Sequence, residues 1–244
     1  MNKTNHSIGT LAPVLFVLLA FCSTAMLGQP YHFAVKHAHG WRSCQGELTI
    51  SQEGITYQDS KEKHDRKWVF KEVQQVRLLS SKELAIVTYE DQRLKWSGDR
   101  SFRFILLDGE ITNSLYRFLL EKTGKPLVAK IAFIETGPTY QLSAKHLHRW
   151  GGCQGTLIFS ENGVIYQTDD KEESRTWLYS DLESIGPMNP FHLRLTTNET
   201  SRFHYGGRAD FNFVLKEKMN EKLYEYLWRH IHKMESPSNG ISSK

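Results

Sequence analysis

The sequence predicts an α+β protein, mostly β, in which a unit of seven antiparallel strands and a C-terminal helix occurs twice in tandem. Three observations support this prediction. A motif, Lys-His-x-His-x-Trp-x-x-Cys-Gln-Gly-x-Leu, begins at Lys36 and again at Lys145. Short stretches in which apolar and polar residues alternate follow each motif, as in half-buried strands. Each unit then ends in a stretch with the 3.6-residue period of an amphipathic helix.

The second copy follows the first at a fixed spacing of 109 residues, which separates His37 from His146 and Cys44 from Cys153. The same spacing, without a gap, relates Gly54 to Gly163, Tyr57 to Tyr166, Trp68 to Trp177, Phe102 to Phe211 and Phe104 to Phe213. Solenoid repeats have periods of roughly 20–50 residues, whereas a unit of about 100 residues is a small domain. We therefore expect one domain at 31–125 and a second at 139–235.

The N-terminal residues 1–25 are expected to be a secretory signal peptide. Lys3 is the only charged residue before the apolar run at 11–21, which is shorter than the roughly 20 residues of a membrane-spanning helix. Small residues precede a cleavage site after Ala25, so we expect a secreted or periplasmic protein. The alternatives are a lipid-modified Cys22 and an uncleaved anchor.

The first copy is expected to form strands at 31–37, 45–51, 55–58, 66–70, 83–89, 93–96 and 102–107. In the second of these, Leu48 and Ile50 face one way while Glu47 and Thr49 face the other. The residues around Val73 and Val76 are predicted to form a loop. The helix is expected over 110–124, where the apolar residues are Ile111, Leu115, Phe118 and Leu119.

The second copy repeats this order. Its strands are expected at 140–146, 154–160, 164–167, 175–179, 192–197, 202–205 and 211–215. The helix that follows carries the apolar residues Leu223, Tyr226, Leu227 and Ile231. The connecting residues 126–138 are too apolar for a flexible linker, so we expect them to pack and to fix the angle between the domains. The tail at 236–244 is rich in Ser, Pro, Asn and Gly and is expected to be disordered.

Two stretches resemble a known superfold. The run Trp177-Leu178-Tyr179-Ser180-Asp181-Leu182-Glu183-Ser184-Ile185, and more loosely the residues 68–73, look like the aromatic strand and following turn of bacterial pleckstrin-homology-like (PH/GRAM-like) domains. The repeated His-x-His and Cys-x-Gly opening is similar to that of secreted bacterial proteins with this fold. The resemblance implies two bent barrels, each plugged by its final helix. Members bind lipids, peptides or proteins or have structural roles, so it implies no particular ligand.

The repeated motif contains residues that ligate metals. His37 and His39 lie two apart on an expected strand, so both imidazoles face one side, and Cys44 could return across the hairpin. The second copy repeats the set with His146, His148 and Cys153. Two imidazoles and a thiolate suit zinc or copper, although no fourth ligand is evident. In the alternative interpretation, which the sequence favours, one histidine of each pair bonds a loop carbonyl and the cysteines lie in the core.

The two cysteines also allow a disulfide. Without the signal peptide, Cys44 and Cys153 are the remaining pair, and an oxidising compartment would permit them to join. Equivalent positions meet only if the domains pack about an axis close to both residues. Buried thiols are therefore the preferred interpretation.

Lipid-binding members of the superfold receive an anionic headgroup on basic residues of the first two strands. This resemblance implies a possible peripheral membrane contact, with Trp41 and Trp150 as interfacial anchors. The basic residues in these regions, besides the histidines, are Lys36, Arg42, Lys145 and Arg149. Against this interpretation, Gln45, Glu47 and Thr49 on the second strand are neutral or acidic, and each tryptophan could instead cover the core.

The net charge and the absence of catalytic motifs argue against nucleic-acid binding and against an enzyme. The net charge of +4 carries no nucleic-acid signature, and neither copy contains a recognisable catalytic constellation or phosphate-binding loop. The sequence therefore predicts a non-enzymatic binding or scaffolding module of the cell envelope or secreted space, with a protein partner at a sheet edge or beside the C-terminal helix. Metal binding, with zinc as the one implied cofactor, and headgroup binding are the alternatives. The oligomeric state stays open.

Overall fold

The computed structural model describes residues 29–39, 42–61, 64–91, 99–134, 137, 140–170, 173–200 and 208–235. Five predictions concern residues outside this part of the chain: the signal peptide at 1–25, Trp41, the strands at 93–96 and 202–205, and the tail at 236–244.

Strands predominate, and the expected α+β, mostly β, class is confirmed. The first copy contains β1 (Tyr31–His39), β2 (Arg42–Ile50), β3 (Ile55–Asp59), β4 (Arg66–Trp68), a 3-10 helix (Phe70–Glu72), β5 (Val73–Ser80), β6 (Glu83–Asp91), β7 (Asp99–Leu106) and α1 (Asn113–Thr123). A short strand follows, β8 (Val128–Ala129). The second copy contains β9 (Tyr140–Leu147), β10 (Gly152–Phe159), β11 (Gly163–Gln167), β12 (Arg175–Leu178), a 3-10 helix (Tyr179–Asp181), β13 (Leu182–Asn189), β14 (His192–Thr200), β15 (Arg208–Leu215) and α2 (Glu221–Glu235).

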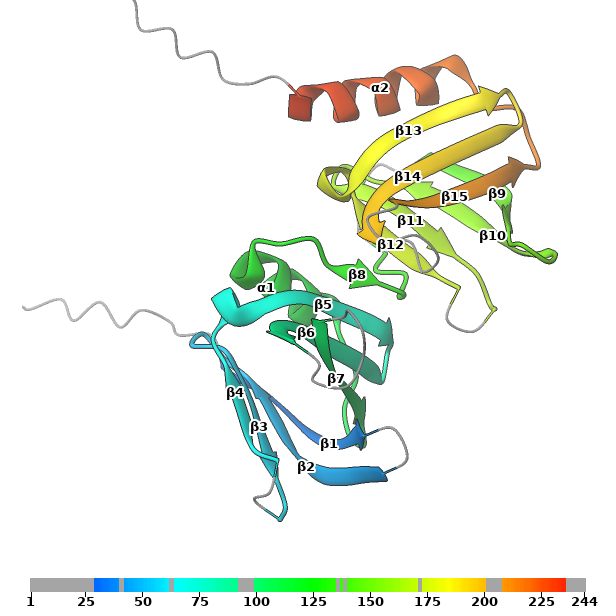
Figure 1. Ribbon diagram of the computed structural model, residues 1–244. Coiled ribbons are helices and arrows are strands. Elements are labelled where there is room, and N and C mark those ends of the chain that lie inside the picture. The colour runs from blue at the N-terminus through cyan, green and yellow to red at the C-terminus, as the bar shows by residue number, and fades with distance from the viewer. Residues whose placement is uncertain are drawn as a thin grey trace, which may run out of the picture.

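The described strands form one hydrogen-bonded sheet in the order β13-β14-β15-β9-β10-β11-β12-β8-β5-β6-β7-β1-β2-β3-β4. The seven strands of each copy keep the same order, and Figure 1 shows them as two lobes. Between the lobes, β8 pairs in parallel with β5 and antiparallel with β12.

The prediction of two separate seven-stranded barrels is therefore wrong in one respect, because the sheet continues from one copy into the other. The reason lies in the connecting residues. Val128 and Ala129 are buried in extended conformation, so their backbone groups need hydrogen-bond partners, and the neighbouring strand edges provide them. For example, the backbone N–H of Lys130 donates to the carbonyl of Leu78 at 2.8 Å.

Each copy nevertheless encloses its own hydrophobic core. One cluster of buried side chains belongs to the first copy and to the connecting residues, and a second cluster belongs to the second copy. The helices add apolar residues to these clusters: Leu115, Tyr116 and Leu119 from α1, and Leu223 and Leu227 from α2. No helix in the described ranges is long and apolar enough to cross a lipid bilayer.

Helix α1 ends at the predicted residue but begins three residues after the predicted start at 110. The side chain of Thr112 accepts a hydrogen bond from the backbone N–H of Leu115, which caps the first turn. Gly124 ends the helix in the left-handed region with a φ of 56°, a conformation that costs glycine little.

The predicted loop around Val73 and Val76 is in fact strand β5, and its counterpart β13 was likewise not predicted. Both strands contain two bulges at equivalent places, and a bulge inserts a residue that breaks the alternation of faces. The buried residues of β5 are consequently Val73, Val76 and Leu78, which do not follow a period of two. A pattern search for alternation misses such a strand.

The connecting residues contact both copies. Phe133 is buried, and its ring stacks on Tyr116 of α1 with centroids 4.6 Å apart. The hydroxyl of Thr176 on β12 donates to the carbonyl of Ile131 at 2.6 Å and accepts from the backbone N–H of Phe133 at 3.0 Å. These contacts anchor the residues that follow β8 to both copies.

Candidate metal centre

In the first copy, the hairpin of β1 and β2 brings His37, His39 and Cys44 together. His37 follows Phe33 and Val35 on the inward face of β1, and it lies directly opposite Cys44 in the strand register. The Cys44 Sγ atom lies 2.9 Å from His39 Nε2 and 3.8 Å from His37 Nδ1. The alternating geometry of a strand thus places both imidazoles beside one thiol.

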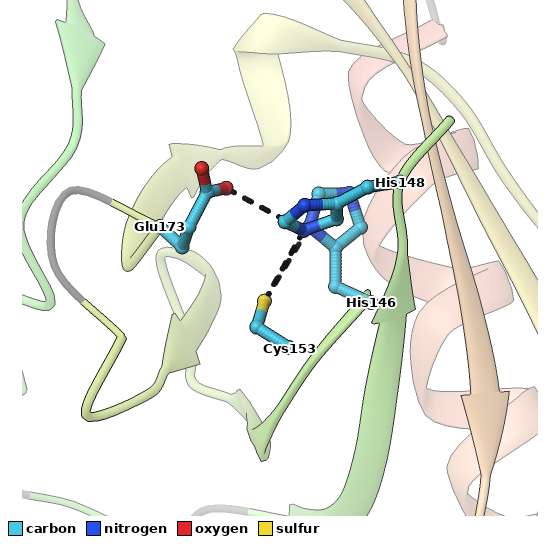
Figure 2. Close-up of side chains that lie close together, drawn as sticks. All are labelled: His146, His148, Cys153 and Glu173. Carbon is cyan, nitrogen blue, oxygen red and sulfur yellow. Dashed lines mark hydrogen bonds and ion pairs between the residues drawn. The ribbon is translucent and has the colours of Figure 1, made fainter. Parts of the chain in front are cut away.

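The second copy repeats this arrangement with the same atoms. Cys153 lies opposite His146 in the register of β9 and β10. Its Sγ atom lies 3.3 Å from His148 Nε2 and 3.9 Å from His146 Nδ1, and the two nitrogens are 3.1 Å apart (Figure 2). The donors in both copies are therefore Nδ1 of the first histidine, Nε2 of the second and the cysteine Sγ.

A buried tyrosine lies behind each cysteine. The hydroxyl of Tyr57 lies 3.1 Å from Cys44 Sγ, and that of Tyr166 lies 3.4 Å from Cys153 Sγ. The Tyr166 hydroxyl also donates to the carbonyl of Cys153 at 2.8 Å. The packing of the Tyr166 ring against the hairpin explains the glycine of the Cys-Gln-Gly motif. A Cβ atom at Gly155 would lie 2.8 Å from Tyr166 Cζ and would overlap the backbone carbonyl of Gln167 on the facing strand.

Aromatic rings surround the first histidine of each pair. The ring of His37 stacks on Phe104 with centroids 4.8 Å apart, and His146 lies 5.0 Å from Phe213. Burial, followed by the charge of the neighbouring histidine, lowers the pKa of His37 and of His146 to about 4. Both imidazoles are therefore neutral at physiological pH, which is the form that binds a metal ion.

A further residue of ligand type lies beside each set, on the loop between the third and fourth strands of its copy. In the second copy this residue is Glu173, whose Oε2 lies 3.6 Å from His148 Nε2 (Figure 2). The four ligand atoms of His146, His148, Cys153 and Glu173 all lie within 4.8 Å of one another.

In the first copy the equivalent residue is His64, 109 residues before Glu173. Its Nδ1 lies 3.1 Å from Asp59 Oδ2, and ligand atoms of His64, Asp59 and Cys44 lie within 4.8 Å of one another. The Asp59 side chain is only 1% exposed.

The sequence interpretation missed both of these residues. The fixed spacing between copies was the signal that relates His64 to Glu173. It was overlooked because the two residues differ in type and lie in a polar loop that a strand pattern does not place. A bond from backbone to side chain closes each loop at its base: Asp59 N–H donates to Asp65 Oδ1 at 2.7 Å, and Thr168 N–H donates to Ser174 Oγ at 3.1 Å.

The possible disulfide between Cys44 and Cys153 is not formed in this structure, where both are free thiols. Each sulfur faces the histidines of its own copy, so the two lie in separate sites. Burial raises the pKa of the Cys153 thiol, a residue that is 3% exposed, whereas Cys44 is half-buried. A bound metal cation would counter this effect by stabilising the thiolate.

Among the described residues, those suggested for headgroup binding do not join the histidine sets. Lys36 and Lys145 are exposed on the opposite strand faces, and Arg42 and Arg149 are exposed near the hairpin turns. Trp150 is 86% exposed at its turn, with the Arg149 guanidinium 5.9 Å from its ring, so it does not cover the core.

A separate groove of about 580 Å³ lies between α2 and the turn that joins β13 to β14. The lining residues include Pro187, Pro190, Met219 and Tyr224. Beside the groove, the exposed rings of Tyr224 and Trp228 stack with centroids 6.4 Å apart.

Comparisons with known proteins leave the function open. No protein-family model matches the sequence, and no curated protein matches it either. Among solved structures, the Spt16D Pob3N heterodimer is similar over 70% of this chain and 84% of that chain, with 10% identity and a TM-score of 0.30. A likeness this slight supports no conclusion about ligand or activity.

Proposed function

We propose that this protein is a non-enzymatic metal-binding protein that holds zinc at a His-His-Cys set in each copy. The observation that carries the proposal is the recurrence of the same three donor atoms in both hairpins, with His64 or Glu173 beside them. Imidazole nitrogen and thiolate sulfur are the donors that zinc prefers.

The distances support this choice of ion. With a zinc–nitrogen bond of about 2.0–2.1 Å and a zinc–sulfur bond of about 2.3 Å, tetrahedral ligands lie about 3.4 Å (N to N) and 3.6 Å (N to S) apart. In the second copy, the His146–His148 nitrogens are 3.1 Å apart, and Cys153 Sγ lies 3.3 and 3.9 Å from them. Small side-chain movements would bring these donors to coordination geometry.

The expected location of the protein agrees with this role. A signal peptide would deliver the chain to an oxidising compartment, where free thiols are open to oxidation. Coordination would protect Cys44 and Cys153 there while keeping them in separate sites. We also infer that each copy is a pleckstrin-homology-like unit that uses its first hairpin to hold the ion, the two units sharing strand edges through β8.

Thermal unfolding with and without a chelator tests the proposal. An ion present at 100 times its dissociation constant stabilises a folded protein by about 2.7 kcal/mol per site, so chelation should lower the unfolding midpoint. Replacing His37 and His39 together with alanine, or His146 and His148 together, should each remove part of this effect. The matched control is His32→Ala, an exposed histidine on β1 that contacts Glu47 instead. A wild-type midpoint that does not respond to chelator would refute metal binding.

A second candidate function is protein binding, which the groove beside α2 favours. Exposed Tyr224 and Trp228 offer the aromatic side chains that are enriched in protein interfaces. Capture of a cell-envelope protein should be lost in Tyr224→Ala and Trp228→Ala. The control is Trp150→Ala, which removes an exposed tryptophan from the turn between β9 and β10 and should retain capture. Equal capture by all variants would eliminate the groove as the binding surface.

A further inference from the structure

The two histidine-cysteine sets differ at one position. Glu173 completes the set of the second copy, where four ligand atoms from four residues lie within 4.8 Å of one another. The corresponding compact set in the first copy contains three residues, His37, His39 and Cys44. The difference comes from a single position of the repeat, which is glutamate in one copy and histidine in the other.

Asp59 accounts for this difference. It holds His64 Nδ1 at 3.1 Å, and its carboxylate also accepts a hydrogen bond from the backbone N–H of Lys61 at 3.3 Å. His64 groups with Asp59 and Cys44, and not with the His37 and His39 nitrogens. The second copy has Thr168 where the first has Asp59, so its loop has no equivalent carboxylate at this position.

The first set is also more open to solvent. Cys44 is half-buried whereas Cys153 is buried, and the second histidine, His39 or His148, is half-buried in both sets. The His64 side chain is 46% exposed, and its ring centroid lies 4.7 Å from that of His39. A small molecule from solution can therefore reach the side of the set that His64 borders.

We propose that the two centres have diverged, and that the first copy binds zinc through three protein ligands and leaves the fourth position to a small anion or water. This inference rests on the proposed metal binding. In the second copy, one thiolate and one carboxylate neutralise Zn²⁺ and close the site, as in structural zinc centres. In the first copy a single thiolate ligates the ion, and the Asp59 carboxylate, within 4.8 Å of Cys44 Sγ, balances the remaining charge from outside the three-ligand set, so the fourth position stays open to a small ligand from solution. His64, whose Nδ1 is held by Asp59, borders this open position without ligating the ion.

Cobalt substitution tests the inference, because Co²⁺ bound to thiolate and imidazole gives visible absorption bands that change when a ligand is added. His146→Ala/His148→Ala protein keeps the first centre, and His37→Ala/His39→Ala protein keeps the second. With azide as the probe, the bands of the first centre should shift and those of the second should not. In wild-type protein, with both hairpins intact, about half of the cobalt absorption should respond.

Two single substitutions assign the roles. Glu173→Gln should give the second centre a response to azide. His64→Ala should keep cobalt in the first centre, and its bands should still shift with azide, because His64 is not one of the three ligands there. The inference is overturned if wild-type protein binds two cobalt ions and neither or both respond to azide, or if His64→Ala abolishes cobalt binding at the first centre. Absence of cobalt bands in wild-type protein would instead refute the proposed metal binding itself.

Discussion

The glycine of the Cys-Gln-Gly motif provides a sharp test of how the hairpin is built. In Gly155→Ala, the new Cβ atom would overlap the backbone carbonyl of Gln167 and lie 2.8 Å from Tyr166 Cζ. Tyr166 is fully buried, its ring centroid is 5.1 Å from that of Phe213, and its hydroxyl is bonded to the Cys153 carbonyl. The ring therefore has no open space to enter.

The cost follows from these contacts. Overpacking a dense core costs about 1–3 kcal/mol, and displacing the tyrosine from its hydrogen bond adds about 1 kcal/mol. We expect Gly155→Ala to lower the free energy of unfolding by about 2–4 kcal/mol. Because Tyr166 also lies against Cys153 Sγ, zinc binding by the second copy should weaken in the same variant.

Urea unfolding of the metal-free protein, followed by circular dichroism, measures the first effect. The matched control is Gly186→Ala in β13 of the same copy, where a Cβ atom would meet no atom within 4 Å. We expect the free energy of unfolding of the control to stay within about 0.5 kcal/mol of wild type, because the added methyl group displaces nothing. If Gly155→Ala unfolds at the same urea concentration as Gly186→Ala, the packing argument is refuted.

Three further predictions concern other parts of the molecule. Burial, and to a smaller extent the charge of Glu199, raises the pKa of Asp181 to about 6, so the folded state holds its proton more tightly than the unfolded state. The free energy of unfolding should thus fall by up to about 3 kcal/mol as the pH rises from 4 to above 6. Urea unfolding at several pH values should show a flatter profile in this range for Asp181→Asn. An unchanged profile in that variant would exclude Asp181 as the origin of the pH dependence. Thr176→Val, which removes the hydroxyl between β12 and the connecting segment, should lower the free energy of unfolding by about 1–3 kcal/mol. Thr196→Val, at an exposed hydroxyl, is the control, and an equal loss in both variants would contradict the bridging role of Thr176. Trp150→Ala should change the unfolding free energy by less than about 0.5 kcal/mol, since a larger loss would mean that this tryptophan packs against the domain.

Regular elements were predictable from the sequence where one face of a strand is buried without interruption. The alternation of Leu48 and Ile50 located β2, and the helical pattern located α1 with its end at Gly124, although the N-cap Thr112 lies two residues after the predicted start at 110. The bulged strands β5 and β13 were not predictable in this way, because each bulge changes which face the next side chain occupies.

The joining of the two copies into one sheet also lay beyond the sequence pattern. A stretch as short as β8 carries no periodicity, and its role depends on the free edges of β5 and β12. The apolar character of Leu127 and Val128 indicated only that the segment packs.

The candidate site was predictable in part. The sequence alone predicted that His37, His39 and Cys44 lie close together, because a two-residue spacing on a strand and a tight hairpin fix their relative positions. His64 could not, since its place depends on how a loop folds back and on its contact with Asp59. Only the fixed spacing that links it to Glu173 connects the two loops in the sequence.

Native mass spectrometry of the protein, purified without chelator and compared with its mass under denaturing conditions, tests metal binding most directly. We predict two zinc ions per chain in the native spectrum. One ion should be missing when His37 and His39 are replaced and the other when His146 and His148 are replaced, while His32→Ala should keep both. A native mass equal to that of the bare chain, unchanged after incubation with zinc, would contradict the proposed function.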